Sequence, residues 1–215
     1  MKLFLDTADI EDIRRAHDSG MLDGVTTNPT HLAKTGMPYK KAIKEICSIV
    51  KGPVSVEAIG SSKDELVNSA KEMVQLAENI NVKIPMTVEG MKAVRELEEN
   101  CGIRTNVTMI FSSTQAFLAL KAGAMFVSIV LSRLDAVAME SDQLLHDAVM
   151  IKQNYDYAGE ILAASLKTQN HVLSSLRMGA DIATLPAALF FQLYNHPLTE
   201  MGIAQFERDW KTIPQ

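Results

Sequence analysis

The chain of 215 residues lacks several features that would assign it to a particular class of protein. No apolar run approaches the ~20 residues that a helix needs to cross a bilayer. No block of lysine and arginine occurs, and the formal net charge is -5, which argues against nucleic acid or an anionic membrane as a partner. An anionic small molecule remains compatible with this charge, because a few local cations are enough to bind it.

Cysteine is scarce as well. The two cysteines, Cys47 and Cys101, both lie in segments with a helical pattern, which favours reduced thiols. The N-terminal segment from Met1 meets an acid at Asp6, too early for a secretion signal. We therefore expect a cytoplasmic protein with reduced cysteines.

The usual motifs of nucleotide and metal sites are also missing. Neither the glycine-rich dinucleotide fingerprint nor a P-loop lysine motif occurs. The five histidines include no pair at zinc-ligand spacing, and His17, His146 and His196 are predicted on helices or helix ends of an outer layer. We therefore expect no metal and no other cofactor, so carbonyl chemistry would require a lysine imine.

What the chain does contain is an alternation of short β-branched runs with amphipathic helical patterns. The predicted strands are 3–6, 24–27, 54–58, 82–86, 104–110, 126–131, 161–165 and 181–185, with Pro29 ending the second. The predicted helices are 10–17, 39–50, 63–77, 90–99, 114–121, 143–155, 171–178 and 187–194, followed by a terminal helix at 203–210.

This alternation predicts an α/β fold, a (β/α)8 TIM barrel formed by a single domain over residues 1–215. An additional C-terminal helix is expected within about residues 200–213. A doubly wound open sheet is the alternative, although it is usually accompanied by a glycine-rich phosphate loop.

One lysine has an unusual place in this pattern. Lys83 lies between Val82 and Ile84 in the apolar fourth strand. In an interior strand the amine would be buried, and a desolvated amine is more readily neutral and nucleophilic than a solvated one. The alternative is a lysine on an edge strand whose head reaches water.

Polar residues on the other strands favour a buried and functional lysine, because they gather toward the strand ends where barrel active sites lie. They are Asp6 on the first strand, Thr26, Thr27 and Asn28 on the second, Glu57 on the third, Asn106 and Thr108 on the fifth, Ser128 on the sixth with Arg133 just beyond, and Ser165 on the seventh next to Lys167. Each alone has a structural explanation: Asp6 as a helix cap, Asn28 as a turn or N-cap residue, Ser165 as a buried hydroxyl. Together, two carboxylates and a lysine at one mouth indicate a catalytic site.

Four segments also resemble a known family. They are 3–8 (LFLDTA), 24–30 (GVTTNPT), 82–87 (VKIPMT) and 106–112 (NVTMIFS). Over essentially its whole length the sequence is similar to the small-subunit transaldolases and the fructose-6-phosphate aldolases, a family of class I aldolases. The resemblance implies a barrel enzyme that acts on sugar phosphates. It also implies a homo-oligomer, pentamer or decamer, in which the C-terminal helix packs on a neighbouring subunit.

The resemblance further implies a role for each candidate residue. Lys83 would form the Schiff base with a ketose, and Asp6 would be the general base for its C4 hydroxyl. Glu57 and Thr108 would hold a water that carries protons during imine formation and hydrolysis. The remaining candidates would bind substrate: Thr26, Asn28, Asn106 and Ser128 around the dihydroxyacetone unit, and Arg133, Ser165 and Lys167 at its terminal phosphate.

The sequence departs from this family between Ser128 and Arg133. The family has proline, an aromatic residue, valine, and glycine or asparagine there, whereas this chain has Ile-Val-Leu-Ser with Val130 at the aromatic position. Position 57 carries the glutamate typical of transaldolases instead of the glutamine of the aldolases, and Lys167 stands where many transaldolases have arginine. Glu57 and the missing phenolic hydroxyl at Val130 both favour transfer over release.

We therefore predict a transaldolase that transfers a dihydroxyacetone unit from fructose 6-phosphate or sedoheptulose 7-phosphate to an aldose phosphate. The alternatives are a lyase that releases free dihydroxyacetone, as a fructose-6-phosphate aldolase would, and a variant for another anionic sugar such as a sulfonated one. A protein that only binds sugar phosphates has no need for Asp6, Glu57 and Lys83 together.

Overall fold

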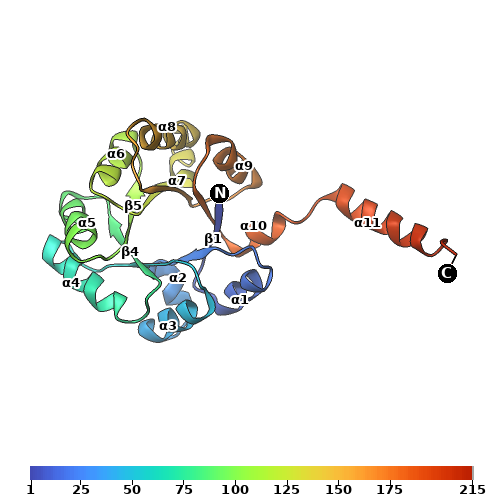
Figure 1. Cartoon of the computed structure of the whole chain (residues 1–215), viewed down its shortest axis with the longest axis horizontal. Helices are drawn as coiled ribbons and strands as arrows, with labels where there is room; N and C mark the ends of the chain where they lie inside the picture. The colour runs from blue at the N-terminus through green and yellow to red at the C-terminus, as the bar shows by residue number, and fades with distance from the viewer. Residues whose placement is uncertain (215) are drawn as a thin grey trace.

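The computed structural model describes residues 1–214 and contains eight parallel strands that close into a barrel (Figure 1). The strands are β1 (Lys2–Asp6), β2 (Gly24–Thr26), β3 (Val54–Glu57), β4 (Ile80–Pro85), β5 (Thr105–Ile110), β6 (Phe126–Val130), β7 (Glu160–Ala164) and β8 (Ile182–Leu185). They pair in chain order, and β1 closes the barrel on β8. The (β/α)8 fold expected from the sequence is confirmed.

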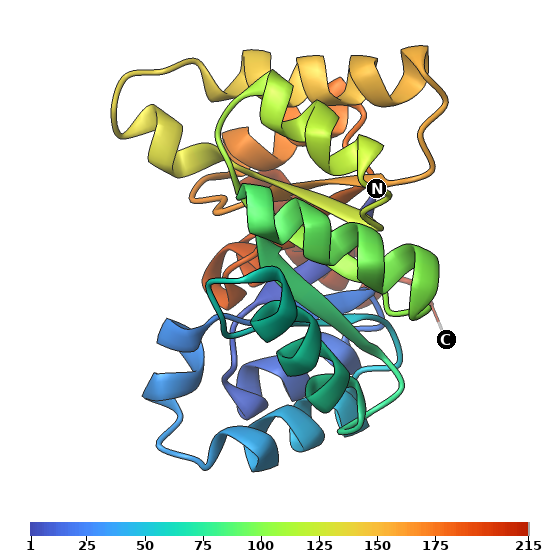
Figure 2. The ribbon, with the colours of Figure 1, turned by 90° about the vertical axis from the view of Figure 1, so that its left-hand side faces the viewer.

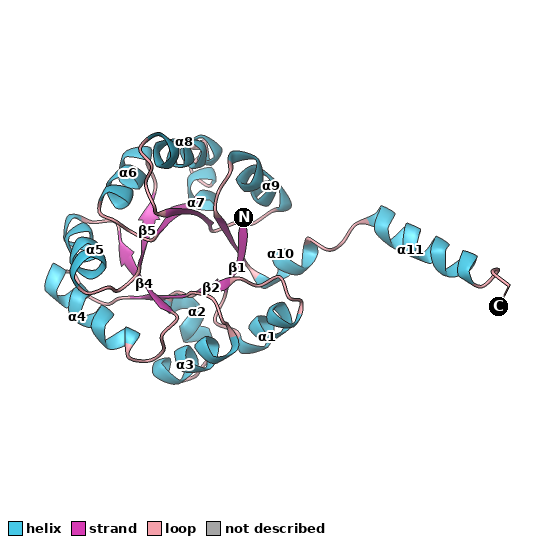
Figure 3. Cartoon of the chain, viewed as in Figure 1, coloured by secondary structure: helices cyan, strands magenta, loops and turns pink. Residues whose placement is uncertain are grey.

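All the helices except the last form a ring around these strands (Figure 3). The helices are α1 (Ile10–Asp18), α2 (Pro29–Lys34), α3 (Tyr39–Ile49), α4 (Lys63–Val74), α5 (Val88–Asn100), α6 (Ser113–Lys121), α7 (Leu131–Asp135), α8 (Ser141–Asn154), α9 (Gln169–Met178), α10 (Ala187–Gln192) and α11 (Pro197–Trp210). Seen from the side, α4 and α5 lie next to each other along the outside of the barrel (Figure 2). None of the helices within residues 1–214 is both long and apolar enough to cross a membrane.

Two short helices, α2 and α7, were not predicted. Pro29 does follow the second strand, but it is also the first residue of α2, a position that suits its fixed φ and missing N–H. Asn28 caps this helix, because its side chain accepts a hydrogen bond from the main-chain N–H of His31. Helix α7 begins at Leu131, which the apolar pattern had assigned to the sixth strand.

Side chains of alternate strand residues form two separate apolar cores. The outward-facing residues of the strands, such as Val56, Val82 and Ile84, are fully buried beneath the helices. A smaller cluster of Phe4, Phe126, Leu162 and Ile182 fills the inside of the barrel. The rings of Phe4 and Phe126 meet edge to face with their centroids 5.9 Å apart.

This inner cluster also explains Gly24 on β2. A Cβ atom at this position would lie 2.6 Å from the Phe4 ring, so only glycine leaves room for it. Phe4 lies two residues before Asp6 on β1, so both side chains face the barrel interior. Apolar groups thus fill part of the interior below the C-terminal ends of the strands, and polar groups occupy the rest of the interior and the mouth.

Helix α11 extends away from the barrel (Figure 1). It begins at Pro197, earlier than the predicted 203, and none of its residues is buried. Its large apolar side chains are open to solvent, with Phe206 74% and Trp210 67% exposed. A helix without a buried face gains no stability from tertiary packing, so this surface is suited to contact with another molecule.

Candidate active site

A cavity of about 420 Å³ opens at the C-terminal ends of the strands. Its lining includes ten of the eleven candidate residues: Asp6, Thr26, Asn28, Glu57, Lys83, Thr108, Ser128, Arg133, Ser165 and Lys167. Seven different strands or the loops after them contribute these side chains. The position of this cavity in the fold is the one that barrel enzymes use for catalysis.

Lys83 lines this cavity from strand β4. Strand β4 pairs with β3 on one side and β5 on the other, so the alternative of an edge-strand lysine is wrong. The side chain is buried, with 8% of the residue exposed, and its Nζ donates a hydrogen bond of 2.9 Å to the carbonyl oxygen of Thr27. The amine is therefore shielded from bulk water but open to a ligand in the cavity.

Asp6 is held by Thr26, which in turn is bonded to a second threonine. The hydroxyl of Thr26 donates to Asp6 Oδ1 at 2.8 Å, and Thr26 shares a further hydrogen bond of 2.7 Å with Thr184 on β8. The alternative role of Asp6 as a helix cap is wrong, because the side chain of Asp9 caps α1 by accepting from the N–H of Asp12. The Asp6 carboxylate thus lines the cavity with one oxygen fixed by Thr26.

Glu57 stands next to Lys83, its register partner on β4. Burial raises the pKa of Glu57, and the charge of Lys83 partly offsets this rise. A carboxyl group with a raised pKa holds a proton more readily than an ordinary one, which suits it to general acid–base chemistry.

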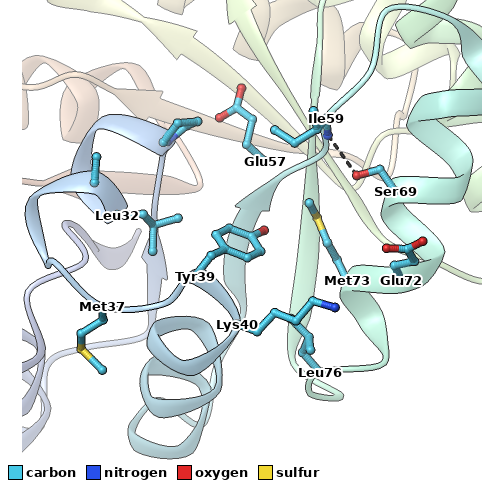
Figure 4. Close-up of a pocket in the computed structure, with 12 residues that line it drawn as sticks. Leu32, Met37, Tyr39, Lys40, Glu57, Ile59, Ser69, Glu72, Met73 and Leu76 are labelled. Carbon is cyan, nitrogen blue, oxygen red and sulfur yellow. Dashed lines mark hydrogen bonds between the residues drawn. The ribbon is translucent and has the colours of Figure 1, made fainter.

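Glu57 also belongs to a second cavity. An apolar groove of about 490 Å³ runs between α2, α3 and α4, and Glu57 lies at its end nearest the barrel (Figure 4). Tyr39 and Met73 line this groove, and only Glu57 and Pro29 line both cavities. Glu57 is therefore half-buried between a polar mouth and an apolar surface, which explains the desolvation of its carboxyl group.

Asn106 is the candidate that does not line the mouth. It is fully buried, its Nδ2 donates to the hydroxyl of Ser55 at 3.0 Å, and its Oδ1 accepts from the hydroxyl of Ser128 at 2.6 Å. Ser55 in turn donates to Oδ1 of Asn81 at 3.3 Å. Asn106 therefore orients Ser128, which does line the cavity, through a buried polar network.

The three candidates for an anion site, Arg133, Ser165 and Lys167, lie at the mouth in the segments that follow β6 and β7. Arg133 projects from α7 and Lys167 from the loop after β7, and both side chains are exposed. Neither pairs with a carboxylate in the part of the chain that the structure describes. The hydroxyl of Ser165 lies 2.6 Å from that of Ser132 on α7, which joins the two segments. Two free cations and adjacent hydroxyls suit a phosphate or a similar anion.

His171 contacts both segments of this anion site. Its Nδ1 accepts a hydrogen bond of 3.1 Å from the main-chain N–H of Lys167, and its Nε2 lies 3.1 Å from Oδ2 of Asp135 at the end of α7. The imidazole ring therefore connects the loop that carries Lys167 with the helix that carries Arg133.

Sequence analysis did not identify His31 as a site residue. Its ring lines the mouth, with Nδ1 3.8 Å from Oδ1 of Asp6 and 3.2 Å from Nδ2 of Asn28. The signal in the sequence was Asn28-Pro29, an N-cap followed by an N1 proline, which starts a helix whose first turn carries His31. Val130, whose residue type departs from the resembled family, also lines the mouth.

Comparisons with known proteins agree with this geometry. Residues 3–215 match the model of a family described as "Transaldolase/Fructose-6-phosphate aldolase". A protein of Aquifex aeolicus named "Probable transaldolase" is 47% identical and covers all of this chain and 99% of its own length. Proteins of the same name from Hydrogenobaculum sp. and Clostridium tetani are each 49% identical over 98% and 99% of their lengths.

A solved structure shows the fold alone. A mandelate oxidase mutant superimposes with a TM-score of 0.59 at 12% sequence identity, covering 86% of this chain and 63% of that one. The family match, in contrast, spans nearly every residue, including all four segments on which the resemblance was based. The chain belongs to the transaldolase/fructose-6-phosphate aldolase family.

Proposed function

We propose that this enzyme is a transaldolase, which transfers a dihydroxyacetone unit from a ketose phosphate to an aldose phosphate through an imine on Lys83. The observation that carries this proposal is the position of Lys83, the only lysine among the buried residues of the described chain, in a cavity with Asp6 and Glu57. Fructose 6-phosphate and sedoheptulose 7-phosphate are the proposed donors.

The anion site would determine the orientation in which the ketose phosphate binds. Arg133 and Lys167 would bind the terminal phosphate of the ketose at one side of the mouth, and the hydroxyl of Ser165 would donate to it. This arrangement leaves the other end of the sugar, with its carbonyl carbon, directed toward Lys83. Binding energy from the phosphate thereby orients the reacting carbonyl.

Imine formation is the first chemical step. The Lys83 nitrogen attacks the ketose carbonyl carbon, and the carbonyl oxygen leaves as water after it gains protons. Glu57 and Thr108 flank Lys83 on the neighbouring strands and would deliver these protons through a bound water. The raised pKa of Glu57, caused by burial, suits a group that must both give and take a proton.

Carbon–carbon cleavage follows. Asp6 removes the proton of the C4 hydroxyl, the C3–C4 bond breaks, and its electron pair moves into the enamine on Lys83. The aldose phosphate leaves, while Asn28 and Ser128 would hold the hydroxyl groups of the bound three-carbon unit, with Thr26 and Asn106 orienting Asp6 and Ser128. Addition of an acceptor aldehyde reverses these steps.

Transfer rather than release is the proposed outcome. Val130 has no hydroxyl to protonate the enamine carbon, and Glu57 is the residue typical of transaldolases in the resembled family. We expect product formation from fructose 6-phosphate to depend strongly on an added aldose phosphate, and Val130→Tyr to increase release of dihydroxyacetone without an acceptor. Fast release by the unmodified protein in the absence of acceptor would instead identify a fructose-6-phosphate aldolase.

A homo-oligomer, pentamer or decamer, is part of the proposal. Helix α11 presents apolar residues, among them Phe206 and Trp210, that no other part of the described chain covers. Packing of this helix on a neighbouring subunit would bury them. We also propose a cytoplasmic location, which is supported by the free thiols of Cys47 and Cys101. The partners are sugar phosphates, with neither nucleic acid nor membrane among them.

A further inference from the structure

His31 is placed to interact with the general base of the proposed reaction. It lies in the first turn of α2, and its side chain is 25% exposed at the mouth of the barrel. Its Nδ1 is 3.8 Å from Oδ1 of Asp6, too far for a hydrogen bond but close enough for one to form after a small shift.

The hydrogen bonds of Asn28 determine which nitrogen of the His31 ring carries the proton. The Oδ1 of Asn28 accepts the main-chain N–H of His31 at 2.9 Å, so its Nδ2 must be the atom 3.2 Å from His31 Nδ1. An amide N–H can donate only to an unprotonated ring nitrogen. This hydrogen-bond network assigns the neutral tautomer of His31, with its proton on Nε2.

Two proton acceptors therefore face each other. Oδ1 of Asp6 accepts the hydroxyl of Thr26, and Nδ1 of His31 accepts the amide of Asn28. With no proton between them, their lone pairs keep the atoms apart. Nδ1 has one lone pair, so a single added proton would replace its hydrogen bond from Asn28 with a charge-assisted hydrogen bond between Nδ1 and Oδ1 of Asp6.

The charged groups around His31 come from several elements. Burial lowers the pKa of His31, Asp6 on β1 opposes this change, and Lys34 on α2, Lys83 on β4 and Lys167 after β7 lower the pKa further. Burial and the three lysines thus favour the neutral ring, in agreement with the tautomer assigned from Asn28. Asp6 is the only one of these four charged groups that favours the protonated ring.

We propose that His31 is a positioning residue for Asp6. Through its Nδ1 it shares the proton that Asp6 takes from the donor, and the pair retains this proton until the acceptor arrives. This inference rests on the proposed transaldolase function. During cleavage the proton moves from the C4 hydroxyl oxygen to Asp6, and the aldose leaves with a new carbonyl group. The proton then lies between Asp6 Oδ1 and His31 Nδ1.

The second half of the reaction returns this proton. The enamine carbon forms a bond to the acceptor aldehyde carbon, and the electron pair of that carbonyl moves to its oxygen. Asp6 then donates the shared proton to this oxygen, which becomes the new hydroxyl group. No oxidant or reductant takes part, and the number of protons on the Asp6–His31 pair is the same before and after the cycle.

Two variants of His31 test this proposal. His31→Asn keeps a polar acceptor near the position of Nδ1, whereas His31→Leu removes it. We expect His31→Leu to lower the kcat of transfer about tenfold with little change in KM. His31→Asn, whose amide oxygen can accept a hydrogen bond from protonated Asp6 but cannot take its proton, should lose clearly less activity than His31→Leu. His31→Leu should also change the pH dependence of kcat, because the retained proton would lose its second acceptor.

Nuclear magnetic resonance gives a more direct measurement. In protein labelled with ¹⁵N histidine, addition of fructose 6-phosphate without acceptor should shift the Nδ1 resonance of His31 toward the protonated form. Asp6→Asn should abolish this shift. His146, whose side chain is 53% exposed on α8, is the internal control and should not respond.

The outcomes separate this inference from the function on which it rests. Reductive trapping of the donor on Lys83 with a normal transfer rate and pH dependence in His31→Leu, together with an unchanged His31 Nδ1 resonance in the unmodified protein, would overturn the role of His31 alone. Absence of any adduct on Lys83 in the unmodified protein would overturn both. Equal losses in His31→Asn and His31→Leu would identify a packing role and likewise contradict the proposal.

Discussion

The Nζ of Lys83 donates a hydrogen bond of 2.9 Å to the carbonyl oxygen of Thr27, which follows β2. Strand β3 lies between β2 and β4 in the barrel, so the lysine side chain reaches across a whole strand to make this contact. The contact directs the amine toward the end of β2, the strand that pairs with β1 at Asp6. An amine fixed in this way has little conformational freedom left to lose when it attacks a carbonyl carbon.

Asp6→Asn should leave imine formation intact while slowing carbon–carbon cleavage. The amide oxygen can still accept the hydrogen bond from Thr26, so the geometry is kept, but an amide cannot take the C4 hydroxyl proton. We expect donor cleavage to slow by roughly 10²–10⁴-fold. Rapid-quench measurement of aldose release, alongside borohydride trapping on Lys83, checks this. Cleavage at the normal rate would leave Asp6 without a catalytic role.

Glu57→Gln should slow imine formation and hydrolysis, by roughly 10²-fold or more for the loss of a general acid–base group. Glu72→Gln, which removes a carboxylate from the apolar groove but not from the mouth, is the matched control. Stopped-flow measurement of imine formation with fructose 6-phosphate distinguishes the two variants. An equal rate in both would assign Glu57 a purely structural role.

The same substitution should stabilise the protein in a defined pH range. The pKa of Glu57 is raised in the folded protein by burial, so the folded state binds the proton more tightly than the unfolded state. The contribution of Glu57 to stability is therefore fully present below its unfolded pKa of about 4.3 and lost as the pH rises through its raised folded pKa. Glu57→Gln should accordingly have a higher Tm than the unmodified protein at pH 7 and an equal Tm near pH 3. A lower Tm at pH 7 would contradict the burial argument.

Arg133→Gln and Lys167→Gln should weaken the binding of phosphorylated donors. Each removes one charge-assisted hydrogen bond, for which we expect a rise in the KM of fructose 6-phosphate of about 10- to 100-fold. Unphosphorylated fructose makes no such contact, so its kcat/KM should hardly change. Arg95→Gln on the outer face of α5 is the control. Equal losses with both sugars would place the phosphate elsewhere.

Substitutions in α11 should dissociate the oligomer. Phe206→Glu or Trp210→Glu places a charge on the exposed apolar face of this helix, whereas Gln205→Glu adds the same charge at a polar position. We expect light scattering to show a pentamer or decamer for the unmodified protein and for Gln205→Glu, and smaller species for the other two. A monomeric unmodified protein would contradict the proposed assembly.

Much of the fold and most of the candidate site could be predicted from the sequence. The alternation of strands and helices has a strong periodic signal, and each polar residue at a strand end interrupts an apolar run, as Glu57 and Lys83 do. In a closed parallel barrel all strand ends meet at one mouth, so residues far apart in sequence could be grouped before any distance was known. The pairing of β3 with β4, which places Glu57 beside Lys83, then follows from the order of the strands along the chain.

The parts that could not be predicted depend on contacts across the chain. Asn106 belongs to the polar pattern of β5, but only the hydrogen bonds to Ser55 and Ser128 reveal that it is buried below the cavity. Helix α7 could not be separated from β6, because Leu131 continues the apolar run of Phe126–Val130 without a turn residue. The orientation of the His31 ring depends on Asn28, whose amide serves both as the cap of α2 and as a donor to the ring.

The imine on Lys83 is tested most directly by borohydride reduction in the presence of fructose 6-phosphate, followed by intact-mass and peptide analysis. We expect a stable adduct with the mass of a reduced dihydroxyacetone unit on Lys83 alone, and no adduct in Lys83→Arg, which should be inactive but folded. An unmodified protein that turns over donor without any adduct, or that carries the adduct on another lysine, would contradict this expectation.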